Sequence, residues 1–260
     1  NANWNPPTTS DQHSSKDQPL HHFQGLDRTL VVGASPARAD VRLAGVSLST
    51  QTVVLDGDAG CANRVKVTFK VHDPRNDEDE LFGLSADITG PDGDIVDFVF
   101  PSQASRSGDY AYYTDWIMLC GSLDDPGTYR VHTELKWWDE NYDDYVVERV
   151  DRFSVKRPTS LTYDATPEPV KKNSALTHRG VLKADPVSYG PKKGVKGAVL
   201  KFWFKADGAK TYVYKGQTTT GTGGKYSKKI KATRSGTWKV VYAGSGTRQP
   251  QTKYDAVKVK

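Results

Sequence analysis

The alternation of apolar and polar residues between positions 64 and 71 is the feature that most constrains the fold of this chain. Every second residue there is apolar and would lie on one face of an extended segment: Val65, Val67, Phe69 and Val71. The Lys and Thr residues between them would lie on the opposite face. This period of two is typical of an antiparallel strand with one buried face.

Short segments of the same kind recur along most of the chain, separated by turns rich in Gly, Pro and Asp. No segment has a helical period, and no apolar run approaches the ~20 residues of a membrane-spanning helix. The pattern predicts an all-β fold of the sandwich or barrel type. Strands are expected at residues 46–49, 51–55, 64–71, 84–89, 95–100, 110–120, 129–138, 145–155, 161–163, 175–184, 199–205, 212–219, 225–232, 237–243 and 254–260.

Charge divides the chain into two parts. Residues 1–157 sum to −11 and residues 158–260 to +16, and the second part has five acidic residues against 21 Lys and Arg. Such asymmetry suggests two units that face different partners. Residues 126–131 are also repeated in similar form at residues 235–240. We therefore predict an N-terminal tail at 1–39, an acidic domain at 40–157 and a basic domain at 158–260.

Residues 125–131, which read Asp-Pro-Gly-Thr-Tyr-Arg-Val, resemble the tyrosine corner of immunoglobulin-like domains. In that motif an aromatic residue enters the sixth strand two positions before an inward-facing residue; here these would be Tyr129 and Val131. The matching position of the second part is Trp238, which has no phenol hydroxyl. We expect two tandem immunoglobulin-like β-sandwich domains after an irregular tail.

The two cysteines, Cys61 and Cys120, allow one internal disulfide. On the immunoglobulin-like pattern, Cys61 starts the second strand and Cys120 ends the fifth, and these strands are antiparallel neighbours. A bridge there would clamp one sheet and suits a secreted, extracellular protein; the alternative is two buried free thiols. The first residues contain no signal peptide, so we expect the chain to begin after a processing site.

Three segments of the second part are similar to small secreted actinobacterial proteins with two tandem immunoglobulin-like domains. They are residues 165–172 (Ala-Thr-Pro-Glu-Pro-Val-Lys-Lys), 199–204 and 236–244. The first part matches more loosely, at residues 46–54, 65–73, 127–131 and 153–157. The resemblance covers roughly residues 40–260. It implies the tandem fold but no activity, because most such proteins have no established function and some are only labelled calcium-binding.

Acidic clusters in the turns of the acidic domain are candidate calcium ligands, because calcium takes six to eight oxygen ligands. No EF-hand loop is present, and solvated acidic turns are the alternative. Calcium is the one cofactor that we consider. Its candidate ligands are Asp73, Asp77, Asp79, Glu80, Asp143 and Asp144.

The excess of lysine in the basic domain favours attachment to an anionic polymer of the cell surface or wall. Trp203 lies on the lysine-bearing face of its strand, and Tyr212 and Tyr214 share a face. Such aromatics can stack on sugars or bases, or simply pack on a neighbouring surface. No groove-binding helix or RNP-like strand is present, so no specific nucleic-acid partner is expected. The candidate polymer-binding residues are Lys171, Lys172, Lys192, Lys193, Lys196, Lys228 and Lys229.

No catalytic motif can be recognised, so we expect a secreted, noncatalytic binding protein rather than an enzyme. One alternative is a protein-recognition or inhibitory module that acts through the loops at 75–80 and 139–144. Another is a calcium-binding structural protein. A hydrolase also stays open, because a catalytic triad is assembled in space and not in sequence. The oligomeric state does not follow from the sequence.

Overall fold

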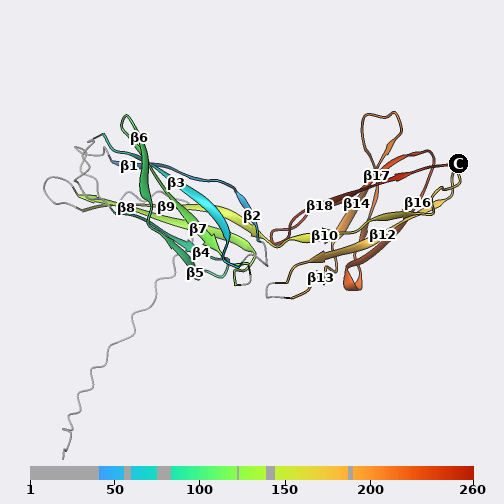
Figure 1. Ribbon diagram of the computed structural model, residues 1–260, viewed down its shortest axis with the longest axis horizontal. Helices are drawn as coiled ribbons and strands as arrows, with labels where there is room; N and C mark the ends of the chain where they lie inside the picture. The colour runs from blue at the N-terminus through green and yellow to red at the C-terminus, as the bar shows by residue number, and fades with distance from the viewer. Residues whose placement is uncertain (1–40, 56–59, 75–82, 122, 139–143, 187–189) are drawn as a thin grey trace, which may run out of the picture.

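The computed structural model describes residues 41–55, 60–74, 83–121, 123–138, 144–186 and 190–260 (Figure 1). Over these residues the chain is built from β-strands and one short 3-10 helix, η1 (Thr222–Gly224). The predicted all-β class is therefore confirmed. The predicted tail at 1–39 lies outside the described residues.

Strands β1 to β9 form two sheets, with the orders β1-β3-β7-β6 and β2-β9-β8-β4-β5. The pair β2–β9 is parallel, and the other neighbours are antiparallel. The bounds are β1 Arg42–Leu48, β2 Thr52–Val54, β3 Asn63–His72, β4 Gly83–Thr89, β5 Ile95–Val99, β6 Ser102–Ser107, β7 Tyr110–Leu119, β8 Gly127–Trp138 and β9 Asp144–Lys156.

Strands β10 to β18 form two further sheets. In one, β12 pairs with β10, β11, β13 and β16; the other has the order β15-β14-β17-β18. The bounds are β10 Thr159–Leu161, β11 Asp164–Thr166, β12 Ala175–Ala184, β13 Lys193–Gly194, β14 Val199–Ala206, β15 Val213–Thr219, β16 Lys225–Lys231, β17 Gly236–Tyr242 and β18 Gln251–Val257.

The strand order of the first part returns in the second part. The arrangement β1-β3-β7 corresponds to β11-β12-β16, and β5-β4-β8-β9 corresponds to β15-β14-β17-β18. This is the two-sheet arrangement of an immunoglobulin-like sandwich. Among the described residues, each sheet takes its strands from one side of Arg157 only. The domain boundaries themselves stay a prediction.

The core of the first sandwich follows the alternation read from the sequence. In β3 the inward side chains of Val65, Val67, Phe69 and Val71 are completely buried, and the residues between them are half-buried. They pack against inward residues of the opposite sheet, which include Ile88, Leu135 and Val155. Hydrophobic burial on one face of each sheet therefore fixes the register of the strands.

Three strands were absent from the sequence-based expectation. β6 is polar and mostly exposed, so it carries no apolar alternation, and β11 and β13 are very short. Two expected strands are displaced: the one at 161–163 lies at Thr159–Leu161, and the one at 254–260 lies at Gln251–Val257. Among the described residues, β6 is an edge strand that pairs only with β7. Its edge position explains why its side chains are polar and exposed.

The predicted tyrosine corner is present. Tyr129 is completely buried in β8, and its hydroxyl donates a hydrogen bond of 2.8 Å to the carbonyl oxygen of Asp125. Trp238 occupies the corresponding place in β17 and packs on the rings of His178 and Phe204, at centroid distances of 4.3 and 4.8 Å. The second sandwich thus replaces a hydrogen bond with aromatic packing at this position.

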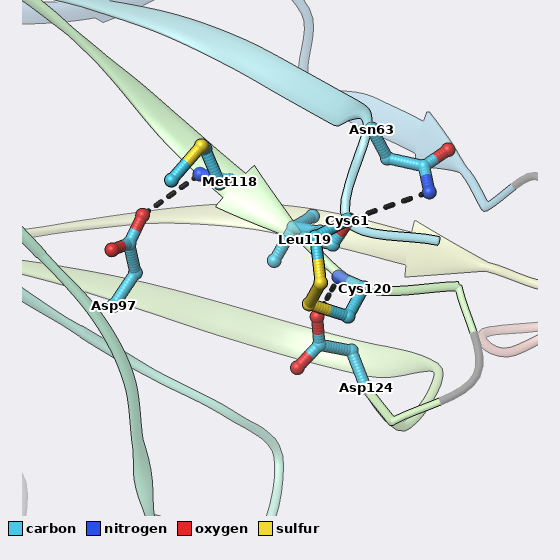
Figure 2. Close-up of a disulfide and its surroundings, with 7 residues drawn as sticks. All are labelled: Cys61, Asn63, Asp97, Met118, Leu119, Cys120 and Asp124. Atoms are coloured by element: carbon cyan, nitrogen blue, oxygen red, sulfur yellow. Dashed lines mark hydrogen bonds between the residues drawn. A yellow bond between two sulfur atoms is a disulfide. The ribbon is translucent and has the colours of Figure 1, made fainter. Parts of the chain in front are cut away.

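Cys61 and Cys120 form a disulfide (Figure 2). Cys61 lies just before β3 and Cys120 just after β7, and in this strand pair Asn63 lies opposite Leu119. The predicted clamp within one sheet is therefore confirmed. The backbone N–H of Cys120 also donates a hydrogen bond to the Asp124 carboxylate, which closes the turn after β7.

Arg157 connects this turn to the second part of the chain. Its buried guanidinium donates hydrogen bonds to the carbonyl oxygens of Gly121 and Asp124. Its backbone N–H donates to Thr247 at 2.9 Å, and its carbonyl accepts from Gln249 at 3.0 Å. One residue therefore contacts both sandwiches.

We expect removal of the disulfide to destabilise the first sandwich. The bridge closes a loop of 59 residues, and loop-closure entropy predicts a loss of up to about 4 kcal/mol in the free energy of unfolding. Guanidinium denaturation of the Cys61→Ser/Cys120→Ser variant measures the loss. Dithiothreitol should lower the midpoint of the wild-type protein and leave that of the variant unchanged. Equal midpoints for wild type and variant would contradict the expectation.

Candidate functional site

The outward face of the sheet β15-β14-β17-β18 carries a group of aromatic and lysine side chains that we call the aromatic–lysine face. β14 alternates between buried apolar residues and outward residues, among them Trp203 and Lys205. The neighbouring strands and the turn before β15 supply the remaining members. The aromatic–lysine face consists of Trp203, Lys205, Tyr212, Tyr214, Lys239 and Tyr254.

Four of these residues form one row across the sheet. Tyr214 lies opposite Trp203, Trp203 lies opposite Lys239, and Lys239 lies opposite Tyr254. Because adjacent strands are about 4.8 Å apart, the row extends over roughly 14 Å. It places three aromatic rings and one ammonium group along a line perpendicular to the strands.

A β-bulge aligns the row. The pairing of β14 with β15 shifts after Phe202, so that Tyr214 and not Lys215 lies opposite Trp203. Gly216, next to the bulge, has a φ of 126°, which a residue with a side chain rarely adopts. Without this shift, Tyr214 would not lie opposite Trp203.

The lysines contact the aromatic rings directly. The Lys239 Nζ lies 4.3 Å from the centre of the Tyr212 ring and 5.5 Å from that of Trp203. The Lys205 Nζ lies 5.3 Å from the Tyr212 ring. Trp203 and Tyr214 meet edge to face at 5.3 Å. These cation–π and aromatic contacts hold the ammonium groups and rings in one layer.

The aromatic–lysine face is exposed and positively charged. Tyr254 is 59% and Tyr214 is 45% exposed. The four strands contain one acidic residue, Asp255, whose carboxylate is occupied by the backbone N–H of Ala165 at 2.7 Å. Among the described residues, Lys205 and Lys239 form no salt bridge. Their charge is therefore not neutralised within the sheet.

A rigid aromatic core supports the face from below. The completely buried His178 of β12 packs against Phe202 and Trp238, which are inward residues of β14 and β17. Its Nδ1 lies 2.8 Å from the Tyr163 hydroxyl. Burial lowers the pKa of His178 from 6.5 to about 4, so the ring is neutral at pH 7.

The lysines predicted as polymer-binding residues lie in three places outside the aromatic–lysine face. Lys171 and Lys172 are exposed between β11 and β12, and the backbone N–H of Lys172 donates to Lys260. Lys192, Lys193 and Lys196 lie in or beside β13, and the Lys192 Nζ is 3.3 Å from Asp185. Lys228 and Lys229 are successive residues of β16.

The sequence drew attention to Trp203, Tyr212 and Tyr214 and to the lysine-bearing face of β14, which includes Lys205, but not to Lys239 and Tyr254. The missing members come from strands that are distant in sequence, and only the register brings them together. The Gly-Thr-Trp-Lys segment at 236–239 was a partial signal, because the residue after an inward Trp must face outward.

Most of the predicted calcium ligands lie outside the described residues: Asp77, Asp79, Glu80, Asp143 and the side chain of Asp144. Asp73 is described and nearly buried, and its carbonyl oxygen accepts hydrogen bonds from both terminal nitrogens of Arg106, at 3.0 and 3.3 Å. In the part of the chain that the structure describes, no group of three or more His, Cys, Asp or Glu is placed to hold a metal ion. Calcium binding stays a prediction.

A membrane-spanning helix is likewise not found among the described residues. The sequence matches no family model and no curated protein. The similarity to secreted actinobacterial proteins therefore stays a prediction.

Several solved structures share a distant structural likeness. Salmonella alpha-2-macroglobulin reacted with methylamine is 12% identical, with coverage of 88% of this chain and 15% of that protein and a TM-score of 0.34. Red sea bream transglutaminase is 13% identical, with coverage of 86% and 32% and a TM-score of 0.34. The D0-D1 domain of intimin is 12% identical, with coverage of 83% and 98% and a TM-score of 0.26. The chain thus spans a small fraction of the alpha-2-macroglobulins, and these likenesses assign neither family nor function.

We expect His178 to make stability depend on pH. An unfolded histidine binds a proton below about pH 6.5, whereas the folded ring does so only below about pH 4. The unfolded state therefore binds more protons in this window, and the free energy of unfolding should fall by roughly 3 kcal/mol as the pH drops from 6.5 to 4.

Urea denaturation over this pH range measures the effect. His178→Gln should remove most of it, and the same substitution at the half-buried His72 of β3 should retain it. A slope that is equal in the two variants would show that His178 is not its source.

Proposed function

We propose that this chain is a secreted, noncatalytic binding protein that attaches to an anionic polymer of the cell surface or wall through residues 158–260. The separation of charge supports this most strongly: 21 Lys and Arg stand against five acidic residues in this part. Two of those acids, Asp164 and Asp185, already pair with Arg179 and Lys192. A surface of this kind attracts polyanions by its summed field.

The disulfide supports a location outside the cell, because such bonds persist in oxidising compartments. A noncatalytic role is supported by the groups with strongly shifted pKa values. Among the described residues, burial raises the pKa of Tyr129, Tyr163 and Tyr226 and lowers that of His178. All four pack in or against the cores and bond to one another or to backbone; for example, the Tyr226 hydroxyl donates to the Thr162 carbonyl at 2.7 Å. Their shifts therefore reflect packing, not a reactive site.

Co-sedimentation of the full chain with purified Gram-positive cell walls, over a salt series, tests the proposal. We expect capture at low salt that declines steeply as salt screens the charges. Lys171→Glu/Lys172→Glu should weaken capture. Lys66→Glu/Lys136→Glu, which reverses two charges in the acidic part, should weaken it less. No capture at low salt would overturn the proposal.

A second candidate is protein recognition by the acidic part, and one observation favours it. Phe98, Phe100, Trp116 and Met118 are all about half exposed or more. The two segments that carry them adjoin, because the Asp115 carboxylate accepts a hydrogen bond from the N–H of Phe100, and the Asp97 carboxylate accepts one from the N–H of Met118 (Figure 2). Exposed apolar side chains in one patch are typical of protein interfaces. Binding through this patch would be tolerant of salt and insensitive to the lysine changes.

A further inference from the structure

We infer that the aromatic–lysine face binds an anionic polysaccharide, with sugar rings stacked on Trp203, Tyr214 and Tyr254 and acidic substituents paired with Lys205 and Lys239. This inference rests on the proposed attachment to anionic polymers and names the surface and the chemistry that would carry it. It differs from the sequence-based expectation, which placed binding on lysines elsewhere in the second part.

The immunoglobulin-like fold does not require these side chains. In the first sandwich, β4, β8 and β9 correspond to β14, β17 and β18, and Tyr129 corresponds to Trp238. The row that matches Trp203, Lys239 and Tyr254 is there formed by Thr89, Arg130 and Arg152. The same strand order with the same register therefore folds without outward aromatics at these positions. Their presence in the second sandwich calls for a reason other than folding.

Exposure of the rings also points to a ligand. Tyr254 and Tyr214 leave about half of their surface in water, at the two edges of the sheet, although aromatic rings gain most when buried. Each ring offers a flat apolar surface with a polar hydroxyl at its tip. A pyranose ring has the matching character, with C–H groups on its faces and hydroxyls around its rim. The open row across the four strands suits an extended chain better than a compact ligand.

The lysines of the face favour a polysaccharide that carries negative charge. Lys239 lies within the row, between Trp203 and Tyr254, and Lys205 lies two residues after Trp203 in β14, on the same face. Both are held beside the Tyr212 ring and not by carboxylates. A ligand carboxylate or phosphate would therefore meet ammonium groups that are already ordered, which lowers the entropic cost of binding. A neutral glycan would leave these charges without partners.

Binding of the full chain to four defined polymers tests this assignment. Alginate has sugar rings and carboxylates, dextran has rings without charge, polyphosphate has charge without rings, and oligo-dT has stacking bases and charge. We expect alginate to bind at least tenfold more tightly than dextran and more tightly than polyphosphate or oligo-dT. Isothermal titration calorimetry at low salt provides the dissociation constants.

Variants of the face separate stacking from charge. Trp203→Ala and Tyr254→Ala should each weaken alginate binding about tenfold, in line with the loss of one stacked ring, and change polyphosphate binding less than twofold. Trp116→Ala, which removes a more exposed outward Trp from the acidic part, should leave both unchanged. Lys239→Gln should weaken alginate and polyphosphate together. Because Trp203 is half-buried, circular dichroism and thermal melting check the fold, and the exposed Tyr254 keeps the test valid if Trp203→Ala is unstable.

The outcomes distinguish this inference from the proposed function. If cell walls and polyphosphate bind but the Trp203 and Tyr254 variants bind alginate like the wild type, the face is not the site and other lysines carry attachment. If dextran equals alginate, charge is not recognised and the anionic ligand is wrong. If oligo-dT binds most tightly and the same variants weaken it, the face stacks bases and the polysaccharide is wrong. If neither walls nor any polyanion binds, the proposed function is wrong as well.

Discussion

Burial of the Arg157 guanidinium constrains the remainder of the structure more than any other single interaction. A charged group out of water is costly unless hydrogen bonds satisfy it, and here the carbonyls of Gly121 and Asp124 accept from it. Both carbonyls belong to the turn that the disulfide at Cys120 and the Asp124 carboxylate also shape. The burial of Arg157 therefore depends on the conformation of that turn. The end of the first sandwich and the start of the second are therefore formed by one set of contacts.

The same residue influences the position of the aromatic–lysine face. Its backbone bonds to Thr247 and Gln249 lie just before β18 (Gln251–Val257). Thr159 strengthens the connection, because its hydroxyl donates to the Gln249 carbonyl and its own carbonyl accepts from the Gln251 amide, both at 2.9 Å. The start of β18 is thus fixed by the junction. Tyr254, three residues further along, takes its place opposite Lys239 as a consequence.

The sequence predicted the features that depend on local pattern. The alternation in β3 located a core strand, Tyr129 located the corner of the sandwich, and the placement of Cys61 and Cys120 on the fold predicted their bridge. It did not predict β6, whose exposed polar residues carry no periodicity. It also missed the row across the second sheet. That row depends on three strand registers and on the bulge at Gly216, and neither can be read from one segment of sequence.

The two sandwiches show how one strand order can present different surface chemistry. The core restricts inward positions to side chains that can be buried. The corresponding inward residues Tyr129 and Trp238 are accordingly both large, aromatic and buried. The next residue along each strand, Arg130 or Lys239, faces outward and has no such restriction. Arg130 lies in a row with Thr89 and Arg152, whereas Lys239 lies in a row with Trp203 and Tyr254. The charges of the two parts are also opposite, so a polyanion drawn to the second sandwich would be repelled by the first. Under the proposed attachment of the basic part, this opposition would leave the acidic part, with its exposed apolar side chains at β5 and β7, free for a different partner.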